Sequence, residues 1–491
     1  MEKYMGNKSK ICQQIFEVTS KVMLDSSDFT VFDPFAGTTN VSRCFKKKGI
    51  NVICNDINDL SYVLAKCYIE CCSIPTFENL FEHPEFAQKI NDALNSENIN
   101  FEELINLLIQ DNRNTTDSDF MECIRESNYL RVLVYLKYIA SEEDWGDNYS
   151  PYYLLQKNYC EHGAHSKYLN QVHKKTIVNL RKRFQEKSPQ QILIDKFLKY
   201  PHSTKHLIEL SELLLKDNEF ETKQIVDDLL SKNLVGKRRF FSIEHGKRFD
   251  IILNLINYWH INELINDIEF YVLLTSVIES IAIFSNTSAT YQAFYKDYRA
   301  NTMQRFRLVI PEIDTTEIES EIYQEDVCNL VPSITADVLY LDPPYNWRQY
   351  DSNYHLLNTV AKFHKITDWK DFEKGIVGAS GENREKKLNY TSFNTKKDFE
   401  KLLLEIIENS PCKTIVLSYS DSKSNHERDE INATLDVLNA FFSDKENFEC
   451  YQLYKIQSVN FESRKGNKKN GINELLFVAK KKRPPKILCK S

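Results

Sequence analysis

The chain has 491 residues, of which 42% are hydrophobic and 27% charged, so it can bury one large or two medium cores. Its net charge of −7 and pI of about 6.0 exclude a uniformly basic surface, so any contact with nucleic acid must be local. The apolar run 270–284 contains Glu279 and is too short to cross a bilayer, and the polar N-terminus does not resemble a secretory signal. We therefore expect a cytoplasmic protein with no membrane partner, and its twelve scattered cysteines predict free thiols.

The first elements predict a nucleotide-binding unit. The run 29–32 is rich in β-forming residues, and a loop of small residues follows it. An amphipathic helix then begins near Thr38 or Thr39, either of which can cap it, while Gly37 lets the backbone of the loop approach a ligand. A second strand at 51–54 ends next to Asp56, and a carboxylate at this point holds the ribose in such folds.

The kind of nucleotide follows from what this loop lacks. It has neither the Gly-x-Gly-x-x-Gly pattern of dinucleotide sites nor the Gly-Lys-Ser/Thr of phosphate-binding loops. The ligand should therefore carry a ribose without a pyrophosphate, and S-adenosylmethionine fits that description. Its sulfonium and amino-acid end would lie beside backbone carbonyls and the carboxylate of Asp33.

The middle of the chain is predicted to be mostly helical. Residues 78–110 are acidic with a helical period, and two basic clusters interleaved with aromatic residues follow at 167–183 and 237–249. We interpret their Lys and Arg side chains as contacts to DNA phosphates; a solvated basic face is the alternative. Histidines lie near Cys160 without a second nearby cysteine, so no metal site is predicted. The candidate DNA contacts in these clusters are Lys174, Lys175, Arg181, Arg183, Arg238 and Arg239.

A polar loop at 286–291 marks the point where the chain is expected to return to the sheet. It is followed by Arg299, Arg305 and Arg307. Arginines at this position could clamp phosphates of a target strand.

The run 338–341 is typical of a buried parallel strand. Pro343 and Pro344 end it, because proline cannot donate a hydrogen bond to a neighbouring strand. Asp342, backbone carbonyls and the ring of Tyr345 then gather at the carboxyl edge of a sheet, where open α/β folds bind ligands. This cluster suits a planar ring that bears an amino group. Further strands of the predicted sheet are 414–419, 451–459 and 473–479, the last two as a hairpin.

Four motifs carry a resemblance to a known family. In chain order they are Lys3-Tyr4-Met5-Gly6-Asn7-Lys8, Asp33-Pro34-Phe35-Ala36-Gly37-Thr38, Asn55-Asp56 and Asp342-Pro343-Pro344-Tyr345. Together they resemble the D12 class, or alpha group, of adenine-specific DNA N6-methyltransferases. The resemblance implies an α/β fold, a Rossmann-like S-adenosylmethionine-dependent methyltransferase sheet with a large, mainly helical inserted domain. The catalytic domain would comprise 1–75 and 286–491, and the insertion, 76–285, would recognise the DNA target.

The resemblance also implies a reaction and its partners. A methyl group would pass from S-adenosylmethionine to N6 of a flipped adenine in double-stranded DNA, in a restriction-modification or related host or phage system. No metal is required, because the sulfonium is already an excellent leaving group and positioning supplies the rate. Double-stranded DNA is the expected partner, with a cognate restriction endonuclease as a possible separate protein, in the cytoplasm of a bacterial or phage-infected cell.

Residue roles follow from the same resemblance. It implies that Tyr4 packs on the adenine of the cofactor, that Lys8 lies near cofactor and DNA, and that Asp56 holds the ribose. Asp326 and Val327 would meet the amino group of that adenine. The methionine end would be lined by Asp33, Phe35, Gly37 and Thr38. The chain departs from the family in two places: Thr39 replaces a frequent second loop glycine, and the loop after Tyr345, with Arg348 as a candidate DNA contact, differs from that of the best-known members.

The catalytic motif, Asp342 to Tyr345, suits the chemistry of an amino group. Adenine N6 is a poor nucleophile because its lone pair is delocalised into the ring. Asp342 and the carbonyl of Pro343 can accept the two amino hydrogens, and Tyr345 can stack on a base that has left the duplex. A transferase for N4 of cytosine or for RNA would use nearly the same site. A catalytically silent DNA-binding protein would not need Asp342, Tyr345 and Asp56 together.

Overall fold

The structure, a computed structural model, describes only part of the chain. The described residues are 8–24, 28–95, 126–138, 140–145, 148–161, 238–288, 290–295, 298–344, 350–377, 380–383, 396–420, 430–458 and 472–482. Within these ranges no helix has the length and apolar character needed to cross a membrane. The cysteines in the same ranges are free thiols, as predicted.

A seven-stranded sheet forms the centre of the fold, in the order β3-β2-β1-β4-β7-β9-β8. The five strands from β3 to β7 in this order run parallel, while β9 runs antiparallel to both of its neighbours. A separate two-stranded sheet joins β5 to β6. The strands are β1 (Thr30–Asp33), β2 (Asn51–Asn55), β3 (Glu321–Tyr323), β4 (Val338–Leu341), β5 (Ile376–Val377), β6 (Glu382–Asn383), β7 (Thr414–Ser420), β8 (Phe448–Ser458) and β9 (Ile472–Lys481).

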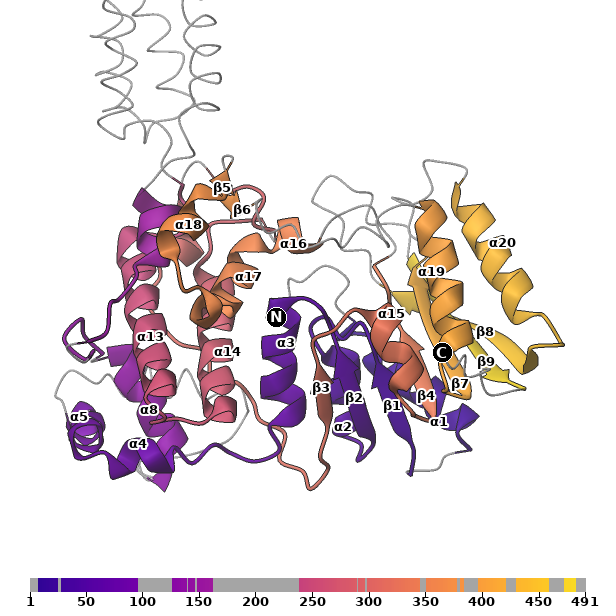
Figure 1. The fold of residues 1–491 in the computed structure, drawn as a ribbon, viewed down its shortest axis with the longest axis horizontal. Coiled ribbons are helices and arrows are strands. Elements are labelled where there is room, and N and C mark those ends of the chain that lie inside the picture. The colour runs from indigo at the N-terminus through magenta and orange to yellow at the C-terminus, as the bar shows by residue number, and fades with distance from the viewer. Residues whose placement is uncertain are drawn as a thin grey trace, which may run out of the picture.

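Helices surround this sheet and form a second group beside it (Figure 1). The first half of the chain contributes α1 (Cys12–Val22), α2 (Asn40–Lys46), α3 (Asp59–Ala65), η1 (Lys66–Glu70), α4 (Glu78–Glu82), α5 (Pro84–Asn95), α8 (Asn128–Tyr138) and η2 (Gln156–Glu161). The second half contributes α13 (Ile243–Ile261), α14 (Asp267–Phe284), η4 (Ala300–Met303), α15 (Val327–Leu330), η5 (Val331–Ser333), α16 (Tyr350–Asn353), α17 (His355–Ala361), η6 (Phe363–Lys365), α18 (Trp369–Lys374), α19 (Lys396–Asn409) and α20 (Glu430–Phe442).

Both faces of the sheet are covered, and this explains the continuous apolar run of β4. Side chains alternate between the faces of a strand. Leu339 and Leu341 pack with α15, α19 and α20 on one face, whereas Val338 and Tyr340 pack with α1 and α2 on the other. All four of these side chains are buried. The result is a three-layer α/β arrangement with a mostly parallel sheet.

The helices from the middle of the chain are packed onto the sheet region. Figure 1 shows α4, α5, α8, α13 and α14 grouped at one side together with α17, and α3 between this group and the sheet. Residues from α8, α13 and α14 belong to the same hydrophobic cluster as residues from α3 and α17. The predicted domain boundaries at 75 and 286 therefore do not separate two hydrophobic cores. The boundaries themselves, and a recognition role for 76–285, stay predictions.

The predicted strands and the start of the first long loop can be compared with the structure. The strands expected at 29–32, 51–54, 338–341, 414–419 and in the C-terminal hairpin are confirmed within a few residues. β3 was missed, because three partly exposed residues carry almost no pattern. The predicted capping by Thr38 or Thr39 is wrong: Thr39 occupies the N-cap position of α2, but its hydroxyl accepts no hydrogen bond from a helix N–H and instead donates to the Thr38 carbonyl, 2.7 Å away.

Candidate functional site

The candidate site lies where the strand order of the sheet reverses. β1 pairs with both β2 and β4, so the chain builds the sheet outward from β1 in one direction and from β4 in the other. Such a switch point leaves a crevice at the carboxyl ends of the two strands, where open α/β folds bind ligands. Asp33 ends β1, and Asp342 directly follows β4. Two carboxylates that are far apart in the sequence thus lie at one edge of the sheet.

The loop after β1 is closed onto the end of β2. Gly37 has φ of 52°, in the left-handed region that favours glycine, and its N–H donates to Asp56 Oδ2 over 2.9 Å. The other oxygen of Asp56 accepts from the N–H of Asn58, also at 2.9 Å. Thr39 is left-handed too, with φ of 62°. Thr39 therefore adopts the conformation that a second loop glycine would adopt more easily.

Asn55, at the end of β2, joins three segments of the site. Its side-chain amide exchanges two hydrogen bonds with the backbone of Glu325, at 2.9 and 3.1 Å, and donates a third to the Pro34 carbonyl at 3.3 Å. The start of α15 is thereby held beside Asp56. Asp326 caps this helix, accepting from the Cys328 N–H at 2.9 Å. Sequence reasoning had named Asn55 only as a neighbour of Asp56.

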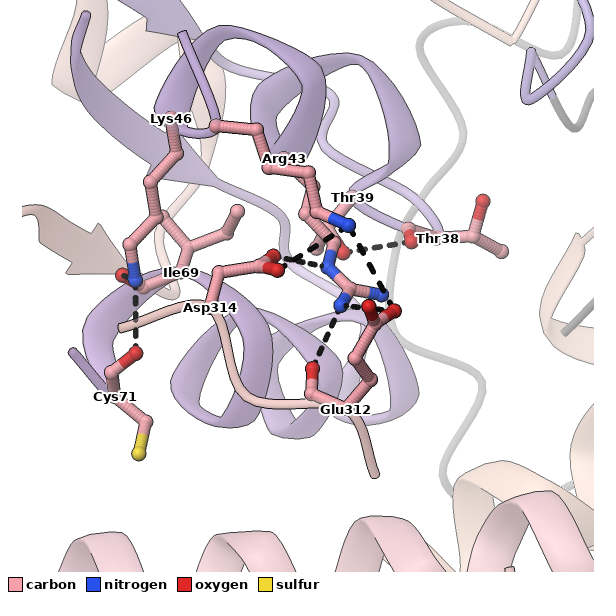
Figure 2. A network of polar contacts seen from close by, with 9 residues as sticks. Thr38, Thr39, Arg43, Lys46, Ile69, Cys71, Glu312 and Asp314 are labelled. Atoms are coloured by element: carbon pink, nitrogen blue, oxygen red, sulfur yellow. Dashed lines mark hydrogen bonds and ion pairs between the residues drawn. The ribbon is translucent and has the colours of Figure 1, made fainter. Parts of the chain in front are cut away.

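The helix after the glycine loop, α2, is anchored by a network of polar contacts (Figure 2). Arg43, in α2, donates from Nε to Asp314 over 2.6 Å and from Nη2 to the carbonyl and carboxylate of Glu312. The buried Lys46 ammonium donates to the carbonyls of Ile69 and Cys71, at 2.6 and 2.8 Å. The first set of contacts ties α2 to the segment that returns to the sheet at β3, and the second ties it to the end of η1.

Asp33 is a buried carboxylate in an acidic setting. It is 2% exposed, and its two oxygens accept from the Ser42 hydroxyl at 2.5 Å and the Phe35 N–H at 3.3 Å. Burial raises the pKa of Asp33 to about 7, the hydrogen bond from Ser42 opposes this shift, and the charges of Asp342 and Asp56 add to it. Burial also raises the pKa of Asp56. The edge of the sheet therefore favours a positively charged ligand.

Asp342 lies against a buried cation, the ammonium of Lys8, at this edge of the sheet. Lys8 Nζ is 3.3 Å from Asp342 Oδ1 and 2.7 Å from Glu474 Oε1. Burial raises the pKa of Asp342, the charge of Lys8 lowers it, and the charge of Glu474 raises it further. Glu474 was missed by sequence reasoning, although an acidic residue within the apolar strand β9 is a usable signal.

The remaining predicted site residues fall into three groups. Phe35, Thr38 and Val327 lie in or beside the loop and helix starts described above, and Pro343 and Pro344 follow Asp342. Arg239, Arg305 and Arg307 are at least partly exposed. The last group lies outside the described residues: Tyr4, Lys174, Lys175, Arg181, Arg183, Tyr345 and Arg348.

Arg238 requires a correction. It is 2% exposed, and its guanidinium donates to the Asn158 carbonyl at 2.7 Å, beside Tyr159 and Gly381. Its guanidinium group is buried within the helical group and is not exposed at the surface. The structure therefore argues against the predicted contact of Arg238 with a DNA phosphate, and a basic pattern in the sequence could not distinguish a buried arginine from an exposed one.

A metal centre is not formed by the part of the chain that the structure describes. No group of three or more His, Cys, Asp or Glu side chains within it has the arrangement needed to hold a metal ion. The acidic residues of the site are instead hydrogen-bonded to the loop backbone, Ser42 and Lys8.

The fold and this site define the class of the protein. A mostly parallel seven-stranded sheet with a glycine loop after β1 and carboxylates at the switch point is consistent with a methyltransferase fold. Comparison with protein families is more specific. The chain belongs to the D12 class N6 adenine-specific DNA methyltransferase family, whose model matches residues 4–200 and 203–427. Members of this family use S-adenosylmethionine, and the family resemblance found in the four sequence motifs is confirmed.

Several curated proteins are similar to the chain. It is 31% identical over 255 residues to Modification methylase StsI of Streptococcus sanguinis, covering 50% of this chain and 35% of StsI. It is also 31% identical over 269 residues to Type II methyltransferase M.FokI of Planomicrobium okeanokoites, covering 54% of this chain and 39% of that protein. Type II methyltransferase M.NlaIII of Neisseria lactamica is 31% identical over 186 residues, which are 38% of this chain and 52% of M.NlaIII.

The chain thus spans between about a third and a half of the length of these relatives. No solved structure matches it.

Proposed function

We propose that this chain transfers a methyl group from S-adenosylmethionine to N6 of an adenine flipped out of double-stranded DNA, as the modification enzyme of a type II restriction-modification system. The observation that carries the proposal is the meeting of Asp33, Asp56 and Asp342 at the switch point of a methyltransferase-type sheet. Family membership supports it, as do relatives whose names describe type II methyltransferases.

The residues of the site fit S-adenosylmethionine. When bound, this cofactor supplies a methyl group on a sulfonium that leaves as a neutral thioether. Asp33 would face the positive methionine end, which offsets the cost of a buried carboxylate whose pKa is raised to about 7. Asp56, already oriented by Gly37 and Asn58, retains lone pairs for the ribose hydroxyls. Phe35, Gly37 and Thr38 would line the methionine end, and Tyr4, Lys8, Asp326 and Val327 would surround the rest of the cofactor.

Asp342 would act on the amino group of the target base. An ionised carboxylate accepts hydrogen bonds only, so Asp342 can accept one amino hydrogen while the Pro343 carbonyl accepts the other. Both bonds favour the localised lone pair that the attack on the methyl group requires. Lys8, at 3.3 Å, favours the ionised form of Asp342 by its charge. Pro344 shapes the turn, and Tyr345 would stack on the flipped base.

DNA would be held by basic residues of local surfaces, because the chain as a whole is acidic. Arg305 and Arg307 are exposed in a segment, 298–307, that contains three arginines and no acidic residue. The segment is held at the end of α14, since the side-chain amide of Asn301 donates to the carbonyls of Ile283 and Ser285 at 2.8 and 3.1 Å. Further proposed DNA contacts are Arg239, Lys174, Lys175, Arg181, Arg183 and Arg348.

Family membership also supports a proposal for the cellular location of the protein and for its partners. We place it in the cytoplasm of a bacterial or phage-infected cell, where its DNA substrate is. A cognate restriction endonuclease would be a separate protein. The helical region 76–285 would recognise the DNA target.

The base that is modified tests the proposal directly. Expressed in a methylation-free host, the wild-type chain should leave N6-methyladenine at one recognition sequence, detected by single-molecule sequencing. The variant Asp342→Ala should lose methyl transfer by at least about a hundredfold, because a transition-state contact is removed, while its DNA affinity stays largely intact.

The possible outcomes separate the candidate activities. N4-methylcytosine in the host DNA, or methylated RNA with unmodified DNA, would replace the proposed substrate. Full activity of Asp342→Ala would refute the role of the carboxylate, and an unmodified host together with tight DNA binding would indicate a catalytically silent protein.

A further inference from the structure

A buried lysine lies between two carboxylates at the carboxyl edge of the sheet. Lys8, which precedes α1, is 2.7 Å from Glu474 Oε1 and 3.3 Å from Asp342 Oδ1. The side chains of Lys8, Asp342 and Glu474 are 8%, 17% and 6% exposed. The Lys8 carbonyl accepts from the N–H groups of Ile11 and Cys12, which fixes the start of the helix and with it the origin of the lysine side chain.

Glu474 is held in place from several sides. It belongs to β9, which is paired on one edge with β7 and on the other with β8. The hydroxyl of Ser418, in β7, donates to Glu474 Oε1 over 2.5 Å, so this oxygen receives both the hydroxyl and the Lys8 ammonium. An ionised side chain inside a packed strand is costly unless it is paired and hydrogen-bonded. Glu474 meets both conditions, and the Lys8 ammonium that pairs with it also contacts Asp342 of the catalytic motif.

We propose that Glu474 is a positioning residue for methyl transfer: it holds the Lys8 ammonium against Asp342 and so fixes the charge and direction of the carboxylate that receives the adenine amino group. This inference rests on the proposed function of Asp342. Glu474 does not touch the substrate and acts through Lys8. Without Glu474, the Lys8 ammonium would turn fully toward Asp342, the other carboxylate beside it.

The charged groups around Asp342 make this role measurable. Lys8 and Glu474 face it directly, Asp33 lies across the switch point, and the phenol of Tyr340 is buried on the same strand. The positive charge of Lys8 lowers the pKa of Asp342, and the negative charge of Glu474 raises it. Removal of Glu474 should therefore lower the pKa of Asp342, and removal of Lys8 should raise it.

The experiment is the pH dependence of single-turnover methyl transfer at saturating S-adenosylmethionine and DNA. In Glu474→Gln the acid limb of the profile should move to lower pH, by on the order of one unit, with a reduced maximal rate. In Lys8→Met the limb should move to higher pH. Glu449→Gln, an exposed glutamate on the neighbouring strand β8, is the matched control and should leave the profile unchanged. A lower rate in Glu474→Gln with an unshifted limb would show a merely structural role and overturn the proposal.

A second comparison covers the case in which Glu474→Gln does not fold. The double variant Lys8→Met, Glu474→Gln removes both partners and leaves neither charge of the pair unmatched. Its acid limb should lie below that of Lys8→Met alone; coincident limbs would overturn the proposal. Wild-type protein that forms no N6-methyladenine would refute the proposed function itself, whereas N6-methyladenine together with an unshifted Glu474→Gln limb would refute only the role of Glu474.

Discussion

The buried carboxyl group of Asp33, at the end of β1, has a raised pKa and is therefore sensitive to a bound positive charge. Its pKa is raised to about 7 by burial and by the nearby carboxylates, with Ser42 as the main opposing contact. In the free protein, ionisation of this group costs folding stability, which is lost as pH rises from about 4 toward 7. A bound cation would reverse the effect, because it stabilises the ionised form.

The affinity for S-adenosylmethionine should therefore depend on pH. If Asp33 faces the cationic end as proposed, the bound cofactor would lower its pKa, so affinity should rise by on the order of tenfold between about pH 5.5 and pH 7.5 and level off above that range. Titration calorimetry at several pH values measures this. In Ser42→Ala, which removes the opposing hydrogen bond, the rise should move to higher pH. A pH-independent affinity in the wild-type protein would contradict the proposed position of Asp33 beside the cationic end of the cofactor.

At the scale of elements, α2 is the part that orients the glycine loop, and its orientation comes from contacts outside its own turn. Arg43 reaches Asp314 and Glu312, which precede β3, and its guanidinium also lies over the Tyr68 ring, 4.5 Å from the centroid. Thr39 begins the helix in a left-handed conformation with no side-chain cap. The contacts drawn in Figure 2 thus fix the position of α2, which no capping side chain does.

Arg43→Gln should weaken both the fold and cofactor binding. Among the described residues it leaves Asp314, 13% exposed, with Lys47 as its remaining ionic partner, so the free energy of unfolding should fall by about 1 to 3 kcal/mol. The affinity for S-adenosylmethionine should fall too, because α2 carries the loop. Urea denaturation and calorimetry measure the two effects.

Lys47→Gln is the matched control for this variant. Lys47 pairs with the same two carboxylates but is 44% exposed, so its loss should cost at most about 1 kcal/mol and leave cofactor affinity unchanged. If Arg43→Gln and Lys47→Gln had equal effects on stability and on cofactor affinity, the contacts of Arg43 would contribute no more than an exposed ion pair does.

At the scale of the whole molecule, the helical group shares a hydrophobic cluster with α3 and α17, the helices that lie next to the site. Residues of α13 and α14 pack with those of α3 and α17, and α3 begins directly after the loop that contains Asp56. The segment 298–307 follows α14 and is held at the end of that helix by the hydrogen bonds of Asn301 to the carbonyls of Ile283 and Ser285. DNA bound by its arginines would therefore be held by the same packed unit that forms the cofactor edge.

The double variant Arg305→Ala, Arg307→Ala tests this arrangement. Loss of two phosphate contacts should weaken DNA binding roughly tenfold or more and reduce the slope of log affinity against log salt by about 2. Binding would be measured by fluorescence anisotropy at several salt concentrations. Lys413→Ala, Lys445→Ala removes the same charge from exposed positions before β7 and β8, at the opposite edge of the sheet, and should change little. Equal affinities of the two double variants would refute the clamp.

Much of the sheet could be predicted because its signals are local. An apolar run of the right length stopped by Pro343 and Pro344 predicts a buried strand, and Asp33 and Asp56 follow such runs directly. Burial of a charged residue has no comparable local signal. Arg238 was predicted at a DNA surface but is enclosed beside Tyr159, since the packing of several helices decides which way its guanidinium points.

The sequence by itself determined the family, the strands and the acidic residues at their carboxyl ends, because short motifs and side-chain periodicity are encoded by neighbouring residues. Only the tertiary structure decided that Lys8 would lie between Asp342 and Glu474, that Arg43 would anchor α2, and that the middle helices would share a hydrophobic cluster with α3 and α17. Each of these contacts joins segments far apart in the chain, and their partners are chosen by strand order and packing, which no local pattern specifies.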